Sequence, residues 1–320
     1  MQDVLGREIN YLRISITDRC NLRCKYCMPE PIDKVGMSEI LTYDEIVALC
    51  RISAELGVKY VKITGGEPLV RLGCVDLIKM IKNVPGIEKV TMTTNGVLLA
   101  ENIGALVSAG LDAVNISLDT RNPKKFAEIT GRDEYDAVVA GIEAAVDAGL
   151  RVKVNSVLMQ GKNDDEWHDL ALLAKEYPLD VRFIEMMPIG YGKASKGISN
   201  ELLQRLLSEK YHLAADNTPH GYGPAVYYNI EGFKGSIGFI SAMHGKFCKE
   251  CNRIRLTSVG FLKPCLCYGE GVDLKTPLRQ GDYDKTKALL KEVIAKKPKE
   301  HCFENEEDIT ESHNMVGIGG

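Results

Sequence analysis

The chain has 320 residues, of which 45% are hydrophobic, 26% charged and 7% aromatic, as in a folded globular protein. Forty basic and 44 acidic side chains leave a net charge of -4, which argues against general affinity for nucleic acid or anionic lipid. The N-terminus has no basic segment followed by an apolar one, and no apolar run approaches the ~18 residues of a membrane span. We therefore expect a cytoplasmic protein with neither a membrane nor a nucleic-acid partner.

From residue 11 to about residue 190, short β-branched runs alternate with amphipathic stretches of helical period, which predicts βα units and a parallel sheet. The predicted strands are 11–17, 60–64, 89–93, 113–118, 151–159 and 180–186. The predicted helices between them are 44–56, 74–82, 101–109, 136–148 and 165–176. Thr42 and Glu45 form a predicted capping box at the first helix. Six units are fewer than the eight of a closed barrel, so we expect a partial (β/α)6 barrel, with a doubly wound sheet as the alternative.

After Gly190 the pattern changes to a region rich in Gly and Tyr, with predicted hairpin strands at 225–230 and 236–241. A basic helix is predicted at 283–297, and the chain ends in Gly319 and Gly320. We therefore predict two domains: residues 1–190 form the partial barrel, and residues 191–320 form a smaller domain that closes its open side.

Six of the ten cysteines lie in two short motifs. Cys20, Cys24 and Cys27 follow the first predicted strand. Three thiolates can hold three irons of a [4Fe–4S] cluster and leave the fourth iron open to a ligand, whereas a zinc site that takes one ligand from elsewhere is the alternative. The segment Thr64–Pro68, with sequence TGGEP, follows the second strand, where its glycines would let a ligand approach the backbone.

The second motif combines Cys248, Cys251 and Cys265 with Arg253 and Arg255, which share one face of a predicted strand. The arginines cannot ligate metal, but beside a second open cluster they would suit an anionic substrate. A zinc ribbon that uses Cys267 as fourth ligand is the alternative. We expect Cys50 and Cys74 to be buried as small hydrophobic residues and Cys302 to be free.

Four cations occupy the predicted parallel strands: Arg13, Lys62, Lys153 and Arg182. Neither a Walker motif nor a strand-linked G-x-G-x-x-G is present, so a nucleotide would not be held by a P-loop or a Rossmann turn. With helices outside the sheet, these side chains are expected to share an anion-binding interior, and a polyphosphate would satisfy them.

The Cys20–Cys27 spacing, with Tyr26 before its last cysteine, resembles the signature of the radical S-adenosylmethionine (SAM) superfamily. The ordered segments GREINYLRISITDRCNLRCKYCMPE, ITGGEPLVR, TTNGVLL, VKVNSVLMQGKN and CKECNRIRLTSVGFLKPCL, with the terminal GG, narrow this resemblance to the GTP 3′,8-cyclase (molybdenum cofactor biosynthesis protein A) family.

That resemblance implies two [4Fe–4S] clusters, one on Cys20, Cys24 and Cys27 and one on Cys248, Cys251 and Cys265. It implies SAM contacts from Tyr26, Gly66, Ser117 and Met187. It also implies GTP contacts from Arg13, Lys62, Thr93, Lys153, Arg253, Ile254 and Arg255, with Arg13, Arg253 and Arg255 assigned to catalysis. Lys62 stands where the family usually has Arg, which keeps the charge but loses bidentate geometry.

The implied activity is a lyase reaction that cyclises GTP to (8S)-3′,8-cyclo-7,8-dihydroguanosine 5′-triphosphate, the first step of molybdenum cofactor biosynthesis. The implied partners are GTP, SAM and an electron donor, and a homodimer is compatible with the sequence. The alternatives are a radical SAM peptide-modifying maturase with an auxiliary cluster, a non-catalytic iron–sulfur electron carrier and a zinc-stabilised binding module.

Overall fold

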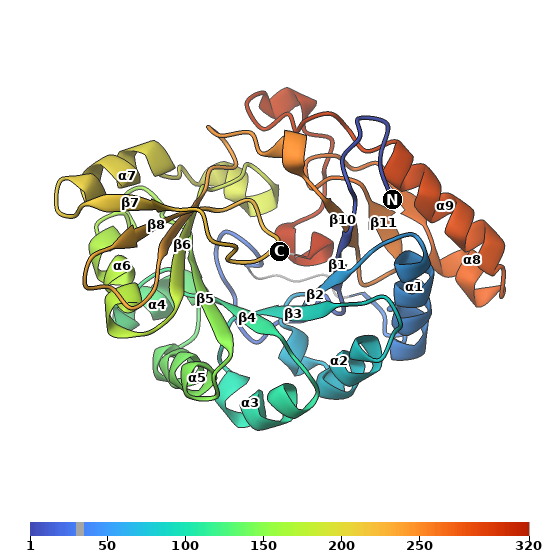
Figure 1. The fold of residues 1–320 in the computed structure, drawn as a ribbon, viewed down its shortest axis with the longest axis horizontal. Coiled ribbons are helices and arrows are strands. Elements are labelled where there is room, and N and C mark those ends of the chain that lie inside the picture. Colours follow the sequence, from blue (N-terminus) through green and yellow to red (C-terminus); the bar gives the residue numbers. More distant parts are fainter. Residues whose placement is uncertain (30–34, 320) are drawn as a thin grey trace.

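Six βα units build most of the molecule in a computed structural model that describes residues 1–29 and 35–319. Their helices lie outside a curved sheet, as Figure 1 shows. The strands are β1 (Tyr11–Ser15), β2 (Tyr60–Thr64), β3 (Lys89–Thr94), β4 (Ala113–Ser117), β5 (Arg151–Ser156) and β6 (Asp180–Ile184). The helices are α1 (Tyr43–Glu55), α2 (Cys74–Lys82), α3 (Leu99–Ser108), α4 (Pro123–Thr130), α5 (Tyr135–Asp147) and α6 (Trp167–Glu176).

The C-terminal region adds shorter elements around this framework. Its strands are β7 (Leu213–Asp216), β8 (Val226–Ile230), β9 (Ile237–Ile240), β10 (Arg253–Leu256), β11 (Phe261–Lys263) and β12 (Val272–Asp273). Its helices are α7 (Asn200–Ser208), α8 (Lys275–Arg279) and α9 (Tyr283–Ala295). The predicted hairpin corresponds to β8 and β9, which pair antiparallel, and the predicted basic helix is α9.

All of these strands belong to one sheet of order β12-β11-β10-β1-β2-β3-β4-β5-β6-β9-β8-β7. The run from β10 through β1–β6 to β9 is parallel throughout. In the described chain β12 and β7 do not pair with each other, so the sheet stays open, which confirms the predicted partial barrel. The domain division at residue 190 stays a prediction, but strands from residues 191–320 extend both sides of the six-stranded core.

Local sequence explains where the helices begin. The predicted capping box is present: the Glu45 amide donates to Thr42 Oγ1 at 3.2 Å, and the Thr42 amide donates to Glu45 Oε2 at 2.7 Å. Helix α4 was not predicted from periodicity because it has only eight residues. Its start signal is nevertheless present, since Asn122 caps it and Pro123 occupies its first turn.

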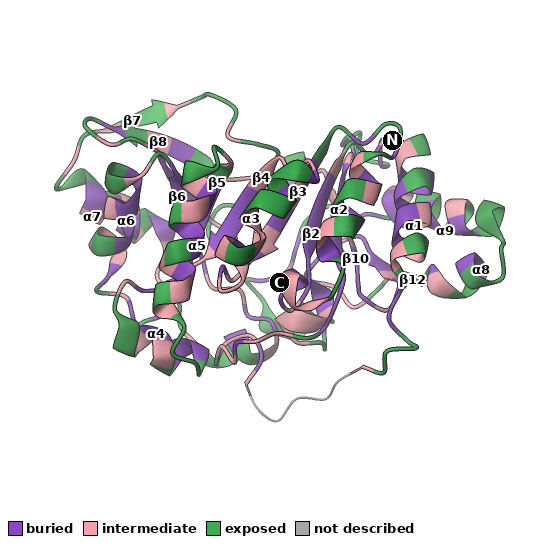
Figure 2. Cartoon of the chain, turned by 90° about the horizontal axis from the view of Figure 1, so that it is seen from below, coloured by how far each residue is buried: buried purple, intermediate pink, exposed green. Residues whose placement is uncertain are grey.

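Strand alternation divides apolar from polar side chains. Leu12 and Ile14 of β1 belong to the core between sheet and helices, whereas Arg13 lies on the opposite, concave face. Figure 2 shows the result, with buried strands inside helices whose outward sides are exposed. No described helix is both long and apolar enough to cross a membrane.

The junction between β6 and β9 offers a test of the packing. Phe183 is 1% exposed and its ring lies 6.1 Å from that of Phe239 on the neighbouring strand. We expect Phe183→Ala to lower the free energy of unfolding by about 3–5 kcal/mol, because the side chain leaves a cavity in the core. Urea unfolding would measure the change, with Leu72→Ala as control because Leu72 is 94% exposed. Equal losses in the two variants would contradict this account of the junction.

Candidate active site

The first cysteine motif lies on the loop that follows the carboxyl end of β1. The amides of Cys27 and Met28 donate to the Cys24 carbonyl at 3.0 and 2.9 Å, which turns the chain between Cys24 and Cys27. Burial raises the pKa of Cys27 to about 12 and that of Cys24 well above its usual value, and negative charge on the neighbouring cysteines adds to both shifts. Thiols this close and buried become thiolates only beside a strong positive charge, which the irons of a cluster provide.

The TGGEP turn packs against this loop. A Cβ at Gly65 would lie 2.7 Å from the Thr17 carbonyl oxygen, and one at Gly66 would meet the Arg19 carbonyl, so both glycines are needed for close backbone approach. The Gly66 amide donates to Thr17 at 2.7 Å. The residues just before the cysteine loop therefore approach the turn closely, and the approach of a ligand stays a prediction.

Glu67 of the same turn connects the ends of β2 and β3. Its carboxylate accepts from Thr94 Oγ1 at 2.8 Å and from the Asn95 amide at 2.6 Å. Asn95 Nδ2 in turn lies 3.7 Å from Cys20 Sγ. Burial raises the pKa of Glu67 to about 7. This carboxylate, which we did not predict to have a role, holds the second and third strand ends against the cysteine loop.

Tyr26 is fixed by a second buried carboxylate. Its hydroxyl donates to Asp119 Oδ2 at 2.6 Å, and the Val157 amide donates to the other oxygen at 2.8 Å. Ser117 lies two residues earlier, at the carboxyl end of β4. The predicted SAM-contacting residues Tyr26, Gly66 and Ser117 therefore lie at the carboxyl side of β1, β2 and β4, whereas Met187 follows β6 and packs with residues around Cys265.

The predicted interior cations do share one space. In the strand register Arg13 pairs with both Lys62 and Arg255, and Asn155 pairs with Arg182. Burial, reinforced by the surrounding arginines, lowers the pKa of Arg13 to about 9 and that of Arg255 to about 10. Burial and the same cations lower the pKa of Lys62 well below its usual value. Such mutual repulsion is relieved by an anion bound among them.

Two asparagines are interspersed with the cations on the strands. Asn155 Oδ1 accepts from Arg182 Nε at 2.8 Å. When its amide oxygen faces inward, Asn115 accepts from Lys62 Nζ at 2.6 Å and from Arg182 Nη2 at 2.8 Å. These neutral acceptors orient the cations without neutralising them, so the interior keeps its positive charge.

Within residues 1–29 and 35–319, several buried polar atoms of this interior have no hydrogen-bond partner. They are Arg253 Nε, Arg255 Nη1 and Thr93 Oγ1. Buried donors are normally paired, so these three atoms point to a ligand that supplies acceptors. Ile254 between the arginines is fully buried on the core side of β10, so only its backbone is available to such a ligand.

The second cysteine motif lies around β10 and β11. The Cys251 amide donates to the Cys248 carbonyl at 3.2 Å, and the thiols of Cys251 and Cys265 raise the pKa of Cys248 in addition to burial. Burial acts to raise the pKa of Cys251, but the Lys297 and Arg253 cations lower it to about 7. Cys251 is therefore better prepared for ionisation than Cys24 or Cys27 of the first set, and the cation of Arg253, which carries an unpaired atom, contributes to this.

Cys267 does not lie in this set as a fourth thiol. Its Sγ is 2.7 Å from Cys302 Sγ, and it is buried in a small apolar cluster with Ile189, Phe303 and Ile318. Cys302 is a free cysteine, as predicted, and its thiol contacts that of Cys267. Cys50 and Cys74 are buried in the main core, as predicted.

The C-terminal tail reaches into the barrel, and Figure 1 shows the C-terminus inside the curve of the sheet. The Val316 amide donates to the Cys27 thiol, and Arg13 Nε donates to the Gly319 carbonyl at 2.6 Å. A Cβ at Gly319 would lie 3.3 Å from that of Ser15, and its φ of +80° also favours glycine. The tail therefore joins the first cysteine site to the cation interior.

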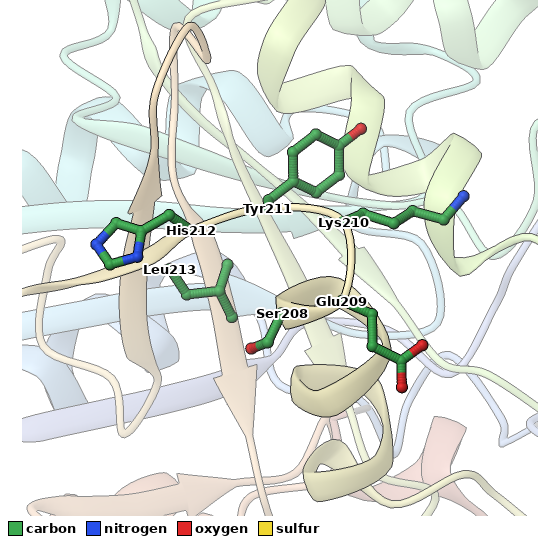
Figure 3. Close-up of a pocket in the computed structure, with 6 residues that line it drawn as sticks. All are labelled: Ser208, Glu209, Lys210, Tyr211, His212 and Leu213. Atoms are coloured by element: carbon green, nitrogen blue, oxygen red, sulfur yellow. The ribbon is translucent and has the colours of Figure 1, made fainter.

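A separate pocket lies at the turn between α7 and β7, and Figure 3 shows its lining side chains pointing in different directions. They are Ser208, Glu209, Lys210, Tyr211, His212 and Leu213. This pocket is open to solvent and contains no cysteine and one cation. The barrel interior, with two thiol sets and six converging cations, is the candidate active site.

Comparison with known proteins agrees with this assignment. A family profile described as Radical SAM superfamily matches residues 14–174, and one described as Molybdenum Cofactor Synthesis C matches residues 179–303. Streptococcus suis SuiB bound to precursor peptide SuiA has a similar fold, with a TM-score of 0.63 and 16% identity over 92% of this chain and 66% of that chain. The chain belongs to the radical SAM superfamily.

Its nearer relatives define the family within that superfamily. It is 47% identical over 323 residues to GTP 3′,8-cyclase of Clostridium perfringens (strain 13 / Type A), with all of both chains covered. It is 46% identical over 328 residues to the enzyme of the same name from Pelotomaculum thermopropionicum, again with both chains covered completely. The chain therefore belongs to the GTP 3′,8-cyclase family, as its motifs predicted.

Tyr26 provides a test of the carboxylate beneath the first cysteine loop. Burial raises the pKa of Asp119 to about 6, although the Tyr26 hydroxyl and the Val157 amide act to lower it. Between about pH 4 and pH 6 the folded protein binds a proton that the unfolded chain has released, so this group destabilises the fold as pH rises. Tyr26→Phe removes a donor to the ionised form and should therefore cost more at high pH.

We expect Tyr26→Phe to lower the free energy of unfolding by about 1–3 kcal/mol at pH 7.5 and by less at pH 5. Urea titration at the two pH values would measure this difference. Tyr283→Phe is the matched control, because Tyr283 is 56% exposed. A cost independent of pH would contradict the role given to Asp119.

Proposed function

We propose that this chain cyclises GTP to (8S)-3′,8-cyclo-7,8-dihydroguanosine 5′-triphosphate, the first step of molybdenum cofactor biosynthesis. The family relationship over the full chain supports this lyase activity. The observation that supports it most directly concerns two buried atoms without a hydrogen-bond partner in the described chain, Arg253 Nε and Arg255 Nη1. They lie in an interior where the cations repel one another. A triphosphate supplies the missing acceptors and negative charge.

The donor sets fit the two [4Fe–4S] clusters. Each offers three thiols, which would leave one iron open, and the nearby Cys267 thiol contacts Cys302. Cys20, Cys24 and Cys27 would hold the first cluster, with SAM beside Tyr26, Gly66, Ser117 and Met187. Cys248, Cys251 and Cys265 would hold the second. When bound, the first cluster and SAM supply the 5′-deoxyadenosyl radical that removes the ribose 3′ hydrogen.

The chain's own residues bind, orient and shield the substrate. Arg13, Lys62 and Lys153 would hold the triphosphate, and Lys62 would act as a point charge rather than a bidentate fork. Arg253, Arg255 and Thr93 would fix the rest of the nucleotide, so that C3′ and C8 stay adjacent. The helices outside the sheet and the tail inside it exclude water and other hydrogen donors from the reacting atoms.

The competing functions leave this interior unexplained. An iron–sulfur electron carrier or a zinc-stabilised module would have no use for six cations in one interior, two of which, Arg253 and Arg255, keep an unpaired donor among the described residues. A peptide-modifying maturase does not by itself call for an interior lined with cations.

A turnover assay tests the activity. Anaerobic protein given dithionite, SAM and GTP should form 5′-deoxyadenosine and a cyclised nucleotide, which chromatography with mass spectrometry would detect. Arg255→Ala should abolish cyclisation and retain about eight irons per chain. Deoxyadenosine formation that is indifferent to GTP would overturn the cyclase assignment but leave the radical SAM assignment standing. Loss of iron from Arg255→Ala would make that arginine structural.

The two cysteines around Leu266 offer a matched pair of substitutions. Cys265→Ser should lower the iron content from about eight to about four per chain, because it removes a ligand of the second cluster. Cys267→Ser should retain about eight, since its thiol faces Cys302. Iron and sulfide analysis after anaerobic reconstitution would measure both. Loss of iron from the Cys267 variant alone would identify it as the true ligand.

The chemistry of the reaction indicates its cellular location and its need for an electron donor. We propose a cytoplasmic location, where reducing conditions keep clustered thiols available for metal. The reaction consumes electrons, so we also propose a reduced electron carrier as a partner. The homodimer stays a prediction.

A further inference from the structure

A charged cluster lies at the amino ends of the strands, opposite the cysteine loops. It centres on His220, whose Nδ1 is 2.9 Å from Asp180 Oδ2 and whose Nε2 is 2.8 Å from Asp216 Oδ2. The ring also stacks on Tyr227, with centroids 3.9 Å apart. None of these four residues was predicted to have a role.

His220 belongs to the segment 217–225 between β7 and β8, which we call the floor loop. Arg151 Nη1 donates to the Pro219 carbonyl at 3.1 Å, and the ring of Tyr222 stacks on that of Tyr60 at 3.4 Å. The loop thus contacts the amino ends of both β5 and β2. Figure 2 shows β7 and β8 on the side of the barrel away from the C-terminus. The floor loop closes the end of the barrel that the tail leaves uncovered.

The floor loop also holds Lys153, one of the predicted triphosphate ligands. Lys153 Nζ donates to the His220 carbonyl and to Tyr227 Oη, the latter at 3.2 Å. These contacts use two of its three N–H groups and leave one for a substrate. Asp180 Oδ2 lies 3.9 Å from the same ammonium. The position and charge of Lys153 therefore depend on the floor loop.

The hydrogen-bond geometry calls for two donors from the His220 ring, because both of its nitrogens face carboxylate oxygens. Asp216 has its pKa lowered by hydrogen bonds from Thr218 and by His220, so it is an ionised acceptor. Asp180 presents a second carboxylate to the other ring nitrogen. A ring that donates to both is an imidazolium, and with Lys153 it offsets the two carboxylates. Without it, only the Lys153 and Arg151 cations of β5 would offset the charge of Asp180 and Asp216 at the floor.

We propose that His220 is a positioning residue for the polyphosphate: it screens Asp180 and Asp216 from the bound anion and holds Lys153 toward it. The inference rests on the proposed function for the identity of the substrate. Binding at the floor can be measured with inorganic triphosphate alone, so this inference and the proposed function can be tested separately.

The test compares His220→Gln with His212→Gln by calorimetric titration of the cluster-loaded protein with inorganic triphosphate under anaerobic conditions. His212 is exposed and lies near the start of β7, which makes it the matched control. His220→Gln should weaken triphosphate binding about tenfold or more, the loss expected for one charge-assisted contact. His212→Gln should bind like the wild type. With GTP, His220→Gln should raise KM and leave kcat nearly unchanged.

A charge-compensating double variant separates screening from folding. His220→Gln with Asp216→Asn restores the net charge of the floor, and both new amides can still hydrogen-bond. Triphosphate affinity should return to within about threefold of the wild type. Affinity as low as in His220→Gln would overturn screening and make His220 merely structural. Wild-type affinity in His220→Gln, or no triphosphate binding by the wild type, would overturn the proposal outright.

The outcomes also distinguish this inference from the proposed function. If the wild type converts GTP but His220→Gln binds triphosphate equally well, the floor proposal fails and the cyclase assignment stands. If the wild type binds triphosphate with the predicted pattern but does not convert GTP, the cyclase assignment fails and the floor proposal stands.

Discussion

The structure depends on the concentration of positive charge on the concave face of a parallel sheet. Strand register alone places Arg13 beside Lys62 and Arg255, and burial denies these groups the water that would screen them. Each cation destabilises the others, and the neutral amides of Asn115 and Asn155 orient them without removing that cost. The tail and the floor loop border this interior and offer backbone carbonyls to its cations. These carbonyls accept hydrogen bonds that a bound anion would otherwise have to accept.

Carboxylates are used differently at the two ends of this interior. At the carboxyl ends, Glu67 and Asp119 are buried, have raised pKa values and accept donors from neighbouring loops, so they fix the cysteine site. At the amino ends, Asp180 and Asp216 are paired with a histidine. Acidic groups thus fasten loops at both ends, while the middle layer is left to cations. This separation keeps an anionic substrate away from unpaired negative charge.

The sequence could predict what depends on local periodicity and on motif spacing. The six βα units, the capping box at Thr42 and the two cysteine motifs all follow from such signals. The pairing of β9 with β6 and of β10 with β1 could not be predicted, because it depends on contacts between residues far apart in the chain. The same holds for His220. No motif in the sequence places it near other ligand-type residues, and it contacts Asp180 only because the fold brings the floor loop against β6. Glu67 had a local signal, its place in TGGEP, but its acceptor role depends on β3.

The pairing of β1 with β10 has a consequence for how the protein is made. Tyr11 lies opposite Arg253, so one edge of the first strand lacks its partner until more than two-thirds of the chain has been synthesised. At ordinary rates of translation that interval is roughly 10–50 s. During it, β1 presents an open edge that can pair with other chains, and the second cysteine motif does not yet exist. The nascent chain therefore holds all three cysteines of its first site well before the second site exists, and the contact of Val316 with Cys27 forms only at the end of synthesis.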